Sequence, residues 1–130
     1  MTTFRLDQLL SPRSVALAGA SPREHSVGRK ILKNLKAGGF AGPIHLINPN
    51  YAEIEGIAAT KDASQLPPID LMVVASPPAT VPDLIATAGE RGCAGAVIIT
   101  AGLGQGAGSL AEATEHAARA HGMRLIGPNC

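Results

Sequence analysis

The sequence predicts one doubly wound α/β domain, built on a five-stranded parallel sheet in the order 3-2-1-4-5. Short apolar runs alternate with amphipathic helical patterns along the chain, which is typical of successive β-α-β units. Aromatic residues make up only 2% of the sequence and hydrophobic residues 45%, so the core must consist of Ala, Val, Leu and Ile. Such small side chains suit a parallel sheet with helices on both faces. The 130 residues correspond to one domain, 1–130, with a lead-in at 1–10.

Strands and helices are expected to alternate in a regular order. The expected strands cover residues 14–19, 44–47, 71–75, 96–100 and 123–126. Ser26 caps the first expected helix, Thr80 caps the second, and Ser109 forms a capping box with Glu112 at the start of the third. A short helix is expected within residues 61–65.

The loops that follow the five strands predict where a ligand would bind. Parallel strands place all their carboxyl ends on one edge of the sheet, so these loops gather there. They are rich in Gly, Pro, Ser and Asn, which allow backbone N–H groups to approach a ligand closely. The loops cover residues 19–26, 48–53, 76–80, 101–108 and 127–130.

Charge and cysteine content restrict the class of protein. A formal net charge of +1 provides no field that would concentrate nucleic acid or hold an anionic membrane. Cys93 and Cys130 are too few for a disulfide framework and indicate a reducing compartment. The N-terminus lacks the pattern of a signal peptide, and no apolar stretch approaches the ~20 residues that cross a bilayer. We therefore expect a cytoplasmic protein without nucleic-acid or membrane partners.

A dinucleotide is the first ligand to test against this architecture. The first turn, residues 19–24, contains only the first glycine of the G-x-G-x-x-G pattern. The second strand ends at Ile47-Asn48, without the acid that would bind ribose hydroxyls. Residues 106–111 fit a looser form of the pattern, but they follow the fourth strand and are discounted. Binding of NAD(H) thus remains a weaker alternative. The sequence also lacks the G-x-x-x-x-G-K-[ST] motif, which excludes a P-loop nucleotide site.

The first turn has features that suit an anion. Ser21 supplies a hydroxyl, Arg23 a guanidinium, and the helix capped by Ser26 an N-terminus. The same helix carries a basic cluster of Arg29, Lys30, Lys33 and Lys36. Two interpretations of this cluster stay open. It is a solvated helix face, or else Arg29 or Lys30 joins Arg23 at a phosphate.

Four motifs occur in an order and spacing that point to a family. They are Ser14–Ser21, Ser26–Arg29, Ile47–Tyr51 and Gly127–Cys130. Together they resemble the N-terminal CoA-binding domain of NDP-forming acyl-CoA synthetases, relatives of the succinyl-CoA synthetase α subunit. The resemblance extends from about Leu9 onward, and the same domain occurs in fusions with a GNAT acetyltransferase domain. It implies a Rossmann-like fold, CoA or acyl-CoA as the ligand, and a place as the first domain of a longer parent.

The resemblance also implies which residues contact CoA. Asn50 stands where the family commonly has a lysine that meets a CoA phosphate, and we expect Arg23 to compensate for it. Ala101 stands where relatives often have an acidic residue. Asn129 and Cys130 fall in the loop near the thiol end of CoA. The full set of expected CoA-binding residues is Ala18, Gly19, Ala20, Ser21, Arg23, Asn50, Ser76, Pro77, Ile99, Thr100, Ala101 and Asn129.

No catalytic residue or metal ligand is predicted within the chain. The resemblance implies that phosphoryl transfer uses a histidine in a later domain, and no such context surrounds His25, His45, His116 or His121. Glu53 and Glu55 are expected on an extended segment and are not taken as a catalytic carboxylate pair. We therefore expect the isolated chain to be inactive.

Two functions remain open. In the first, the domain holds CoA for thioester formation in an acid–thiol ligase, with an ATP-grasp or β-type subunit or downstream domains as partners. In the second, it is a non-catalytic module that senses CoA or acyl-CoA.

Overall fold

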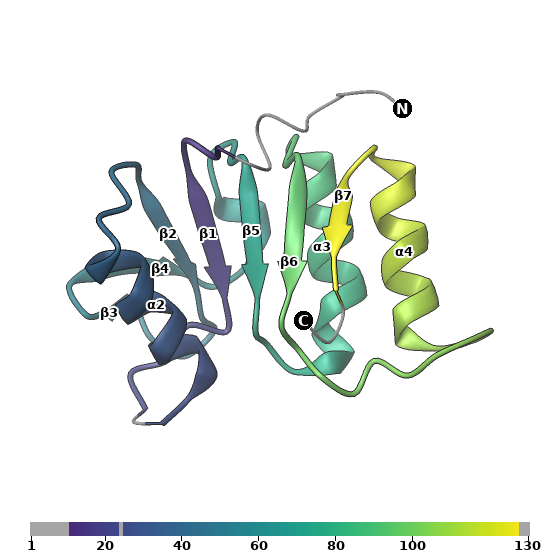
Figure 1. Ribbon diagram of the computed structural model, residues 1–130, viewed down its shortest axis with the longest axis horizontal. Helices are drawn as coiled ribbons and strands as arrows, with labels where there is room; N and C mark the ends of the chain where they lie inside the picture. Colours follow the sequence, from purple (N-terminus) through teal and green to yellow (C-terminus); the bar gives the residue numbers. More distant parts are fainter. Residues whose placement is uncertain (1–10, 24, 128–130) are drawn as a thin grey trace.

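The computed structural model describes residues 11–23 and 25–127, and it contains one mixed, seven-stranded sheet (Figure 1). The strand order is β3-β4-β2-β1-β5-β6-β7. All neighbouring strands pair in parallel except β3 and β4, which are antiparallel. The strands are β1 (Val15–Ala18), β2 (Ile44–Ile47), β3 (Glu53–Ile54), β4 (Ile57–Thr60), β5 (Leu71–Val74), β6 (Gly95–Ile98) and β7 (Arg124–Ile126).

The α/β class is confirmed, but the predicted five-stranded order 3-2-1-4-5 is wrong. The expected third strand is β5, and it pairs with β1 on the side opposite β2, so that Ala18 faces both Ile47 and Val74. The place predicted for it beside β2 is taken by β4, with Thr60 opposite Ile47. The five expected strands therefore lie in the order 2-1-3-4-5, and a hairpin that the sequence analysis missed completes the sheet.

The missed hairpin consists of β3 and β4. Its two-residue turn is Glu55-Gly56, and both residues have positive φ angles, 53° and 80°. Two-residue turns of this kind match the twist of antiparallel strands. Ile54 before the turn is buried and Ile57 after it packs against the same cluster. The expectation that Glu55 lies on an extended strand is thus wrong, because it occupies the turn.

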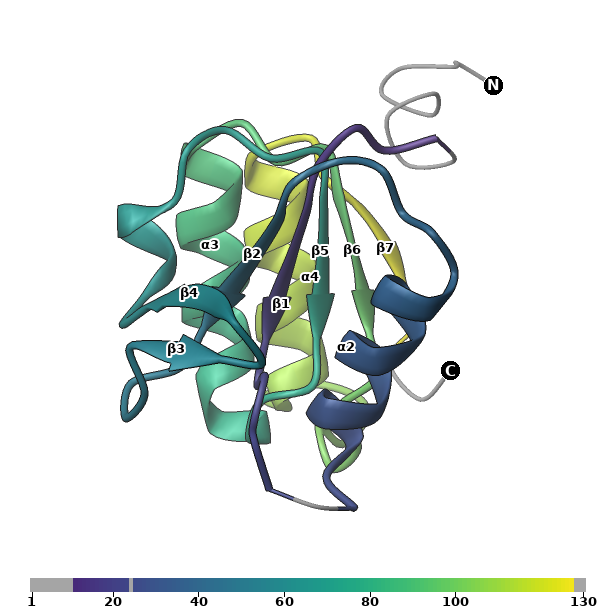
Figure 2. The same ribbon diagram turned by 90° about the vertical axis from the view of Figure 1, so that its left-hand side faces the viewer.

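The helices lie on both faces of the sheet, with α2 on one face and α3 and α4 on the other (Figure 2). One hydrophobic core forms under α3 and α4, and it includes Met72, Val74 and Ile98 from the sheet. A smaller core under α2 contains Leu17, Leu32 and Leu46. The helices are α2 (Val27–Ala37), α3 (Val81–Glu90), α4 (Leu110–Ala120) and the 3-10 turns η1 (Ala63–Gln65) and η2 (Pro78–Thr80).

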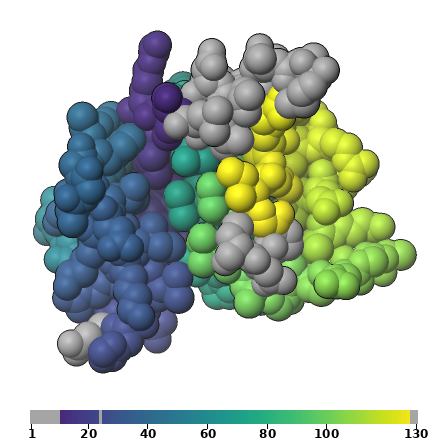
Figure 3. All heavy atoms as spheres, in the orientation of Figure 1, coloured from purple at the N-terminus to yellow at the C-terminus, as the bar shows by residue number. Residues whose placement is uncertain are grey.

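The face that carries α2 is only partly covered by that helix. In the space-filling view, atoms of β5, β6 and β7 are visible beside α2 (Figure 3). Val73 and Val97 are half-buried, and Ile126 is 45% exposed. Apolar side chains of three neighbouring strands therefore reach the surface on this face.

Two of the three predicted helix caps are confirmed. The Oγ atoms of Ser26 and Ser109 accept the backbone N–H groups of Arg29 and Glu112, each at 3.1 Å. Thr80 occupies the predicted N-cap position of α3, but its side chain does not cap the helix, because the η2 turn already places Thr80 in a helical conformation (φ −85°, ψ −15°). Its hydroxyl instead donates to the Pro77 carbonyl at 2.6 Å. The expected short helix in 61–65 is confirmed as η1.

The helices are short. Those of the described residues contain ten or eleven residues each, so none is long and apolar enough to cross a membrane.

Candidate functional site

A cavity of about 1510 Å³ opens at the carboxyl edge of the sheet. Its walls come from the loops that follow β1, β2, β4, β5 and β6, together with the first turns of α2 and α3. This is the edge where doubly wound folds bind their ligands. The prediction that the loops after the strands would gather around one site is therefore confirmed for the loops after β1, β2, β5 and β6, whereas residues 128–130 lie outside the described residues.

The cavity brings together most of the residues that the sequence analysis singled out. Asn129 lies outside the described residues, as does Cys130. The other expected binding residues all line the cavity, namely Ala18, Gly19, Ala20, Ser21, Arg23, Asn50, Ser76, Pro77, Ile99, Thr100 and Ala101. Their contact with a ligand stays a prediction.

Two glycines allow the backbone to pack tightly at the base of the cavity. Gly19 has φ +92°, and a Cβ there would lie 2.5 Å from the carbonyl carbon of Ala75. The space that a Gly19 side chain would need is thus taken by the loop after β5. A Cβ on Gly28 would lie 2.0 Å from the Gly19 carbonyl oxygen. The first turn of α2 therefore rests directly on the end of β1.

The structural role of Gly28 was missed in the sequence. In the dinucleotide fingerprint, the third glycine permits close packing of the helix against the strand. Gly28 performs this function from within α2, further along the chain than the fingerprint requires. A glycine in the first turn of a predicted helix was the signal that could have revealed it, because glycine is otherwise unfavourable there.

Asn48 joins the first two loops of the site. Its side-chain amide donates to the Ala20 carbonyl at 2.7 Å. Its Oδ1 accepts the N–H groups of Asn50 at 2.7 Å and Tyr51 at 3.2 Å. One side chain at the end of β2 thus holds the loop after β1 and organises the loop after β2.

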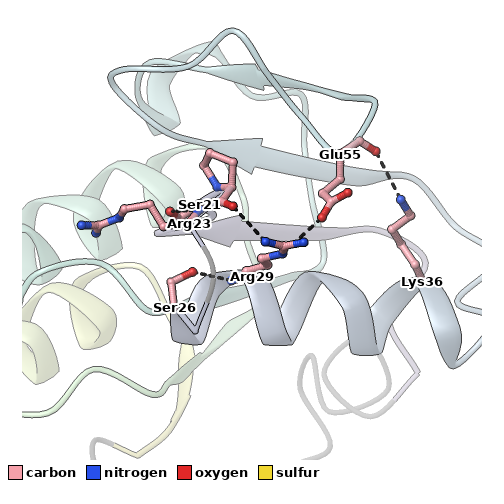
Figure 4. Close-up of polar contacts among 7 residues, drawn as sticks. Ser21, Arg23, Ser26, Arg29, Lys36 and Glu55 are labelled. Atoms are coloured by element: carbon pink, nitrogen blue, oxygen red, sulfur yellow. Dashed lines mark hydrogen bonds and ion pairs between the residues drawn. The ribbon is translucent and has the colours of Figure 1, made fainter.

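Arg23 is oriented by the loop that carries it. The Oγ of Ser21, itself only 8% exposed, accepts the backbone N–H of Arg23 at 3.1 Å. The Arg23 side chain points away from Arg29 (Figure 4), and no other described residue forms an ion pair with it. Its guanidinium is therefore available to an anion in the cavity.

Arg29 has a different role. Its Nη1 donates to the Pro22 carbonyl at 3.2 Å, and its Nε lies 3.4 Å from Glu55 Oε1 (Figure 4). Lys36 Nζ donates to the Glu55 carbonyl at 3.2 Å. Arg29 does not line the cavity, and its side chain is only 28% exposed. It is thus neither a freely solvated residue nor a cavity residue, but connects the first loop to the β3–β4 turn.

Replacing Arg29 with alanine should lower the free energy of unfolding by about 1 kcal/mol, because a partly buried ionic contact and a hydrogen bond are lost together. Arg119→Ala is the matched control. Arg119 lies 3.7 Å from Glu115 on α4, and its side chain is 79% exposed, so its loss should cost less than about 0.5 kcal/mol. Urea unfolding of both variants measures the difference. Equal stability of the two variants would show that the Arg29 contacts do not tie the loop to the turn.

The hydroxyl of Thr100 connects two other loops. Thr100 is 8% exposed, and its Oγ1 donates to the Ser76 carbonyl at 2.7 Å. This bond joins the end of β6 to the loop after β5. Thr100 therefore shapes the cavity wall through its hydroxyl.

Three charged residues in the cavity were missed by the sequence analysis. They are Lys61, Asp62 and Asp83. Lys61 and Asp62 reach this edge because β4 runs parallel to β2, and the hairpin turn at Glu55-Gly56 was the signal that could have placed them. The Ser64 hydroxyl, and then its backbone N–H at 2.8 Å, hold the pKa of the Asp62 carboxyl below its usual value. Asp62 is therefore ionised at neutral pH.

Comparison with known proteins identifies the family. A family model described as a CoA binding domain matches residues 13–130. An ADP-forming acetate–CoA ligase from Methanocaldococcus jannaschii is 42% identical over 98% of this chain, which covers 18% of that ligase. The alpha subunit of the ADP-forming acetate–CoA ligase II from Pyrococcus furiosus is 37% identical over 96% of this chain, which covers 28% of that subunit.

Solved structures agree with this assignment. The apo form of a dinucleotide forming acetyl-coenzyme A synthetase 1 from Ca. Korarchaeum cryptofilum superposes with a TM-score of 0.88, at 35% identity, over 95% of this chain and 28% of that chain. The chain spans 18% and 28% of the length of the two curated relatives named, and it matches their N-terminal part. The resemblance stated from the sequence motifs is thus confirmed, and the chain belongs to the family of CoA-binding domains found in ADP-forming acyl-CoA ligases.

Proposed function

We propose that the cavity binds CoA or acyl-CoA and holds it for thioester formation. The observation that carries this proposal is the composition of the site at the switch point between β1 and β5. There the α2 N-terminus and Arg23, which forms no ion pair with any other described residue, favour phosphate, while Asn48 stands where an NAD site has an acid. The arrangement suits a nucleotide with a diphosphate but without a free ribose diol.

Different residues of the cavity would bind different parts of the ligand. Ser21, Arg23 and the first turn of α2 would bind the diphosphate. Ser76-Pro77 and the segment 99–101 would lie along the adenosine or pantetheine. CoA supplies the thiol nucleophile, and the chain supplies its position. Among the described residues, no group of three or more His, Cys, Asp or Glu side chains is placed so that it could hold a metal ion.

In a complete ligase this domain would deliver the CoA thiol to an acyl phosphate formed elsewhere in the protein. The parts of the relatives that this chain does not cover, or a separate subunit of the ATP-grasp type, would form that acyl phosphate. The isolated chain would then bind CoA without turnover. The share of the relatives that the chain covers, 18 to 29%, supports this division of labour.

A sensing module is the second candidate. A conserved hypothetical protein from Pyrococcus furiosus is 30% identical, with a TM-score of 0.70, and this chain covers 94% of it. A similar domain thus makes up almost the whole of another chain. The coding sequence after residue 130 separates the two candidates, since a further ligase domain favours the first and an acetyltransferase domain the second.

Titration calorimetry tests the ligand. We expect CoA or acetyl-CoA to bind more tightly than NAD or ADP, because β2 ends without the acid that binds the ribose diol of NAD, and ADP lacks the pantetheine arm. The four ligands should be compared in one buffer at one salt concentration, since phosphate contacts weaken with salt. Tighter binding of NAD than of CoA would overturn the proposal.

A further inference from the structure

We propose that Lys61 binds the 3′-phosphate on the ribose of CoA. Among the described residues, the cations that line the cavity are Arg23 and Lys61, and they come from different loops. CoA carries two separate anionic groups, the 5′-diphosphate and the ribose 3′-phosphate. This inference rests on the proposed function, and it assigns one cation to each anionic group.

The backbone holds Lys61 close to the end of β2. Thr60 pairs with Ile47, and the N–H of Asn48 donates to the Thr60 carbonyl at 2.9 Å. The N–H of Lys61 itself donates to Gln65 Oε1 at 3.1 Å. Lys61 therefore follows directly on the residue that is bonded to Asn48, at the carboxyl edge of the sheet.

The end of the second strand is where doubly wound folds place the ribose. An acid there binds the ribose hydroxyls, and a nearby cation accommodates a ribose phosphate instead. In this chain β2 ends without an acid, and Lys61, directly after the adjacent β4, supplies the cation. Arg23 precedes α2, in the position that binds the diphosphate. The two cations are thus placed for different phosphates.

The charge of Lys61 is not neutralised by an ion pair with any described residue. The neighbouring carboxylate of Asp62 is engaged by the N–H and hydroxyl of Ser64. Asp62 and Asp83 add negative charge to the cavity, which opposes phosphate binding in general. A cation close to one phosphate offsets this unfavourable effect of the two carboxylates locally. Asn50, on the adjoining loop, is uncharged and cannot offset it.

Calorimetry with CoA and dephospho-CoA, which lacks only the 3′-phosphate, tests the assignment. We expect Lys61→Ala to weaken CoA binding roughly tenfold and to change dephospho-CoA binding by less than about twofold. Lys61→Arg should restore most of the preference for CoA. Lys33→Ala is the matched control, because Lys33 is an exposed lysine outside the cavity, and it should alter neither affinity.

The outcomes distinguish the two proposals. If Lys61→Ala weakens both ligands equally, or neither, the assignment of Lys61 is wrong while CoA binding stands. If the unmodified chain binds neither ligand, the proposed function itself fails. The preference of the unmodified chain for CoA over dephospho-CoA should also shrink as salt is raised, since an exposed ion pair is screened.

Discussion

Gly28→Ala is expected to destabilise the protein by at least about 2 kcal/mol. In an isolated helix the same change would be stabilising, because alanine has a helix propensity about 1 kcal/mol better than glycine. Here the new Cβ would lie 2.0 Å from the carbonyl oxygen of Gly19, a backbone atom that cannot turn aside. Relieving the contact would require α2 to move away from β1 and to loosen the core around Leu32. Overpacking of this kind outweighs the gain in propensity.

Asn34→Ala is the matched control for this prediction. Asn34 is exposed on the same helix, so its replacement measures the gain in propensity without a clash. Urea unfolding of the two variants should move their midpoints in opposite directions. A Gly28→Ala variant as stable as Asn34→Ala would mean that α2 does not rest on the end of β1.

Arg23→Ala is expected to weaken CoA binding by about 1.5 to 3 kcal/mol, which corresponds to roughly 10- to 150-fold in the dissociation constant. The loss should be similar for CoA and dephospho-CoA, because Arg23 is assigned to the diphosphate that both ligands contain. Its side chain forms no ion pair with another described residue, so the fold should be unaffected. Calorimetry at fixed salt, with a thermal melt as a control on folding, measures the effect.

Two further variants complete this test. Asn50→Lys should strengthen CoA binding, most clearly at low salt, because it returns a cation to a loop that lines the cavity. Lys33→Ala should leave the affinity unchanged. If Arg23→Ala binds CoA normally and Lys33→Ala does not, the ligand lies along α2 and not in the first loop.

Local patterns were sufficient to predict much of the fold. Ser26 and Ser109 cap their helices as expected, because a serine hydroxyl directly before an amphipathic run can accept a backbone N–H of the first helical turn. The five expected strands are apolar enough to be recognised one at a time. Their order was harder to predict, since no residue of β5 indicates on which side of β1 it will pair. In the structure β4 pairs with the edge of β2 that was expected to hold β5, and β5 pairs with the opposite edge of β1.

The site was predicted in part for the same reason. Residues that directly follow a recognised strand, such as Ser21 and Ser76, were placed correctly at the cavity. Lys61 was not, because its position depends on a hairpin whose first strand contains only Glu53 and Ile54. Arg29 could be placed on its helix but not paired, since its partner Glu55 becomes a neighbour only when that hairpin folds back.

The bonds made by Asn48 have a consequence for the speed of binding. This side chain holds the loops after β1 and β2 through hydrogen bonds within the protein itself, so we expect these loops to be ordered before a ligand arrives. The conformational entropy of that part of the wall is lost during folding and not during association. A site organised in advance in this way presents one constant shape to every encounter, so diffusion and orientation of the ligand, and not rearrangement of these two loops, would limit the rate of capture.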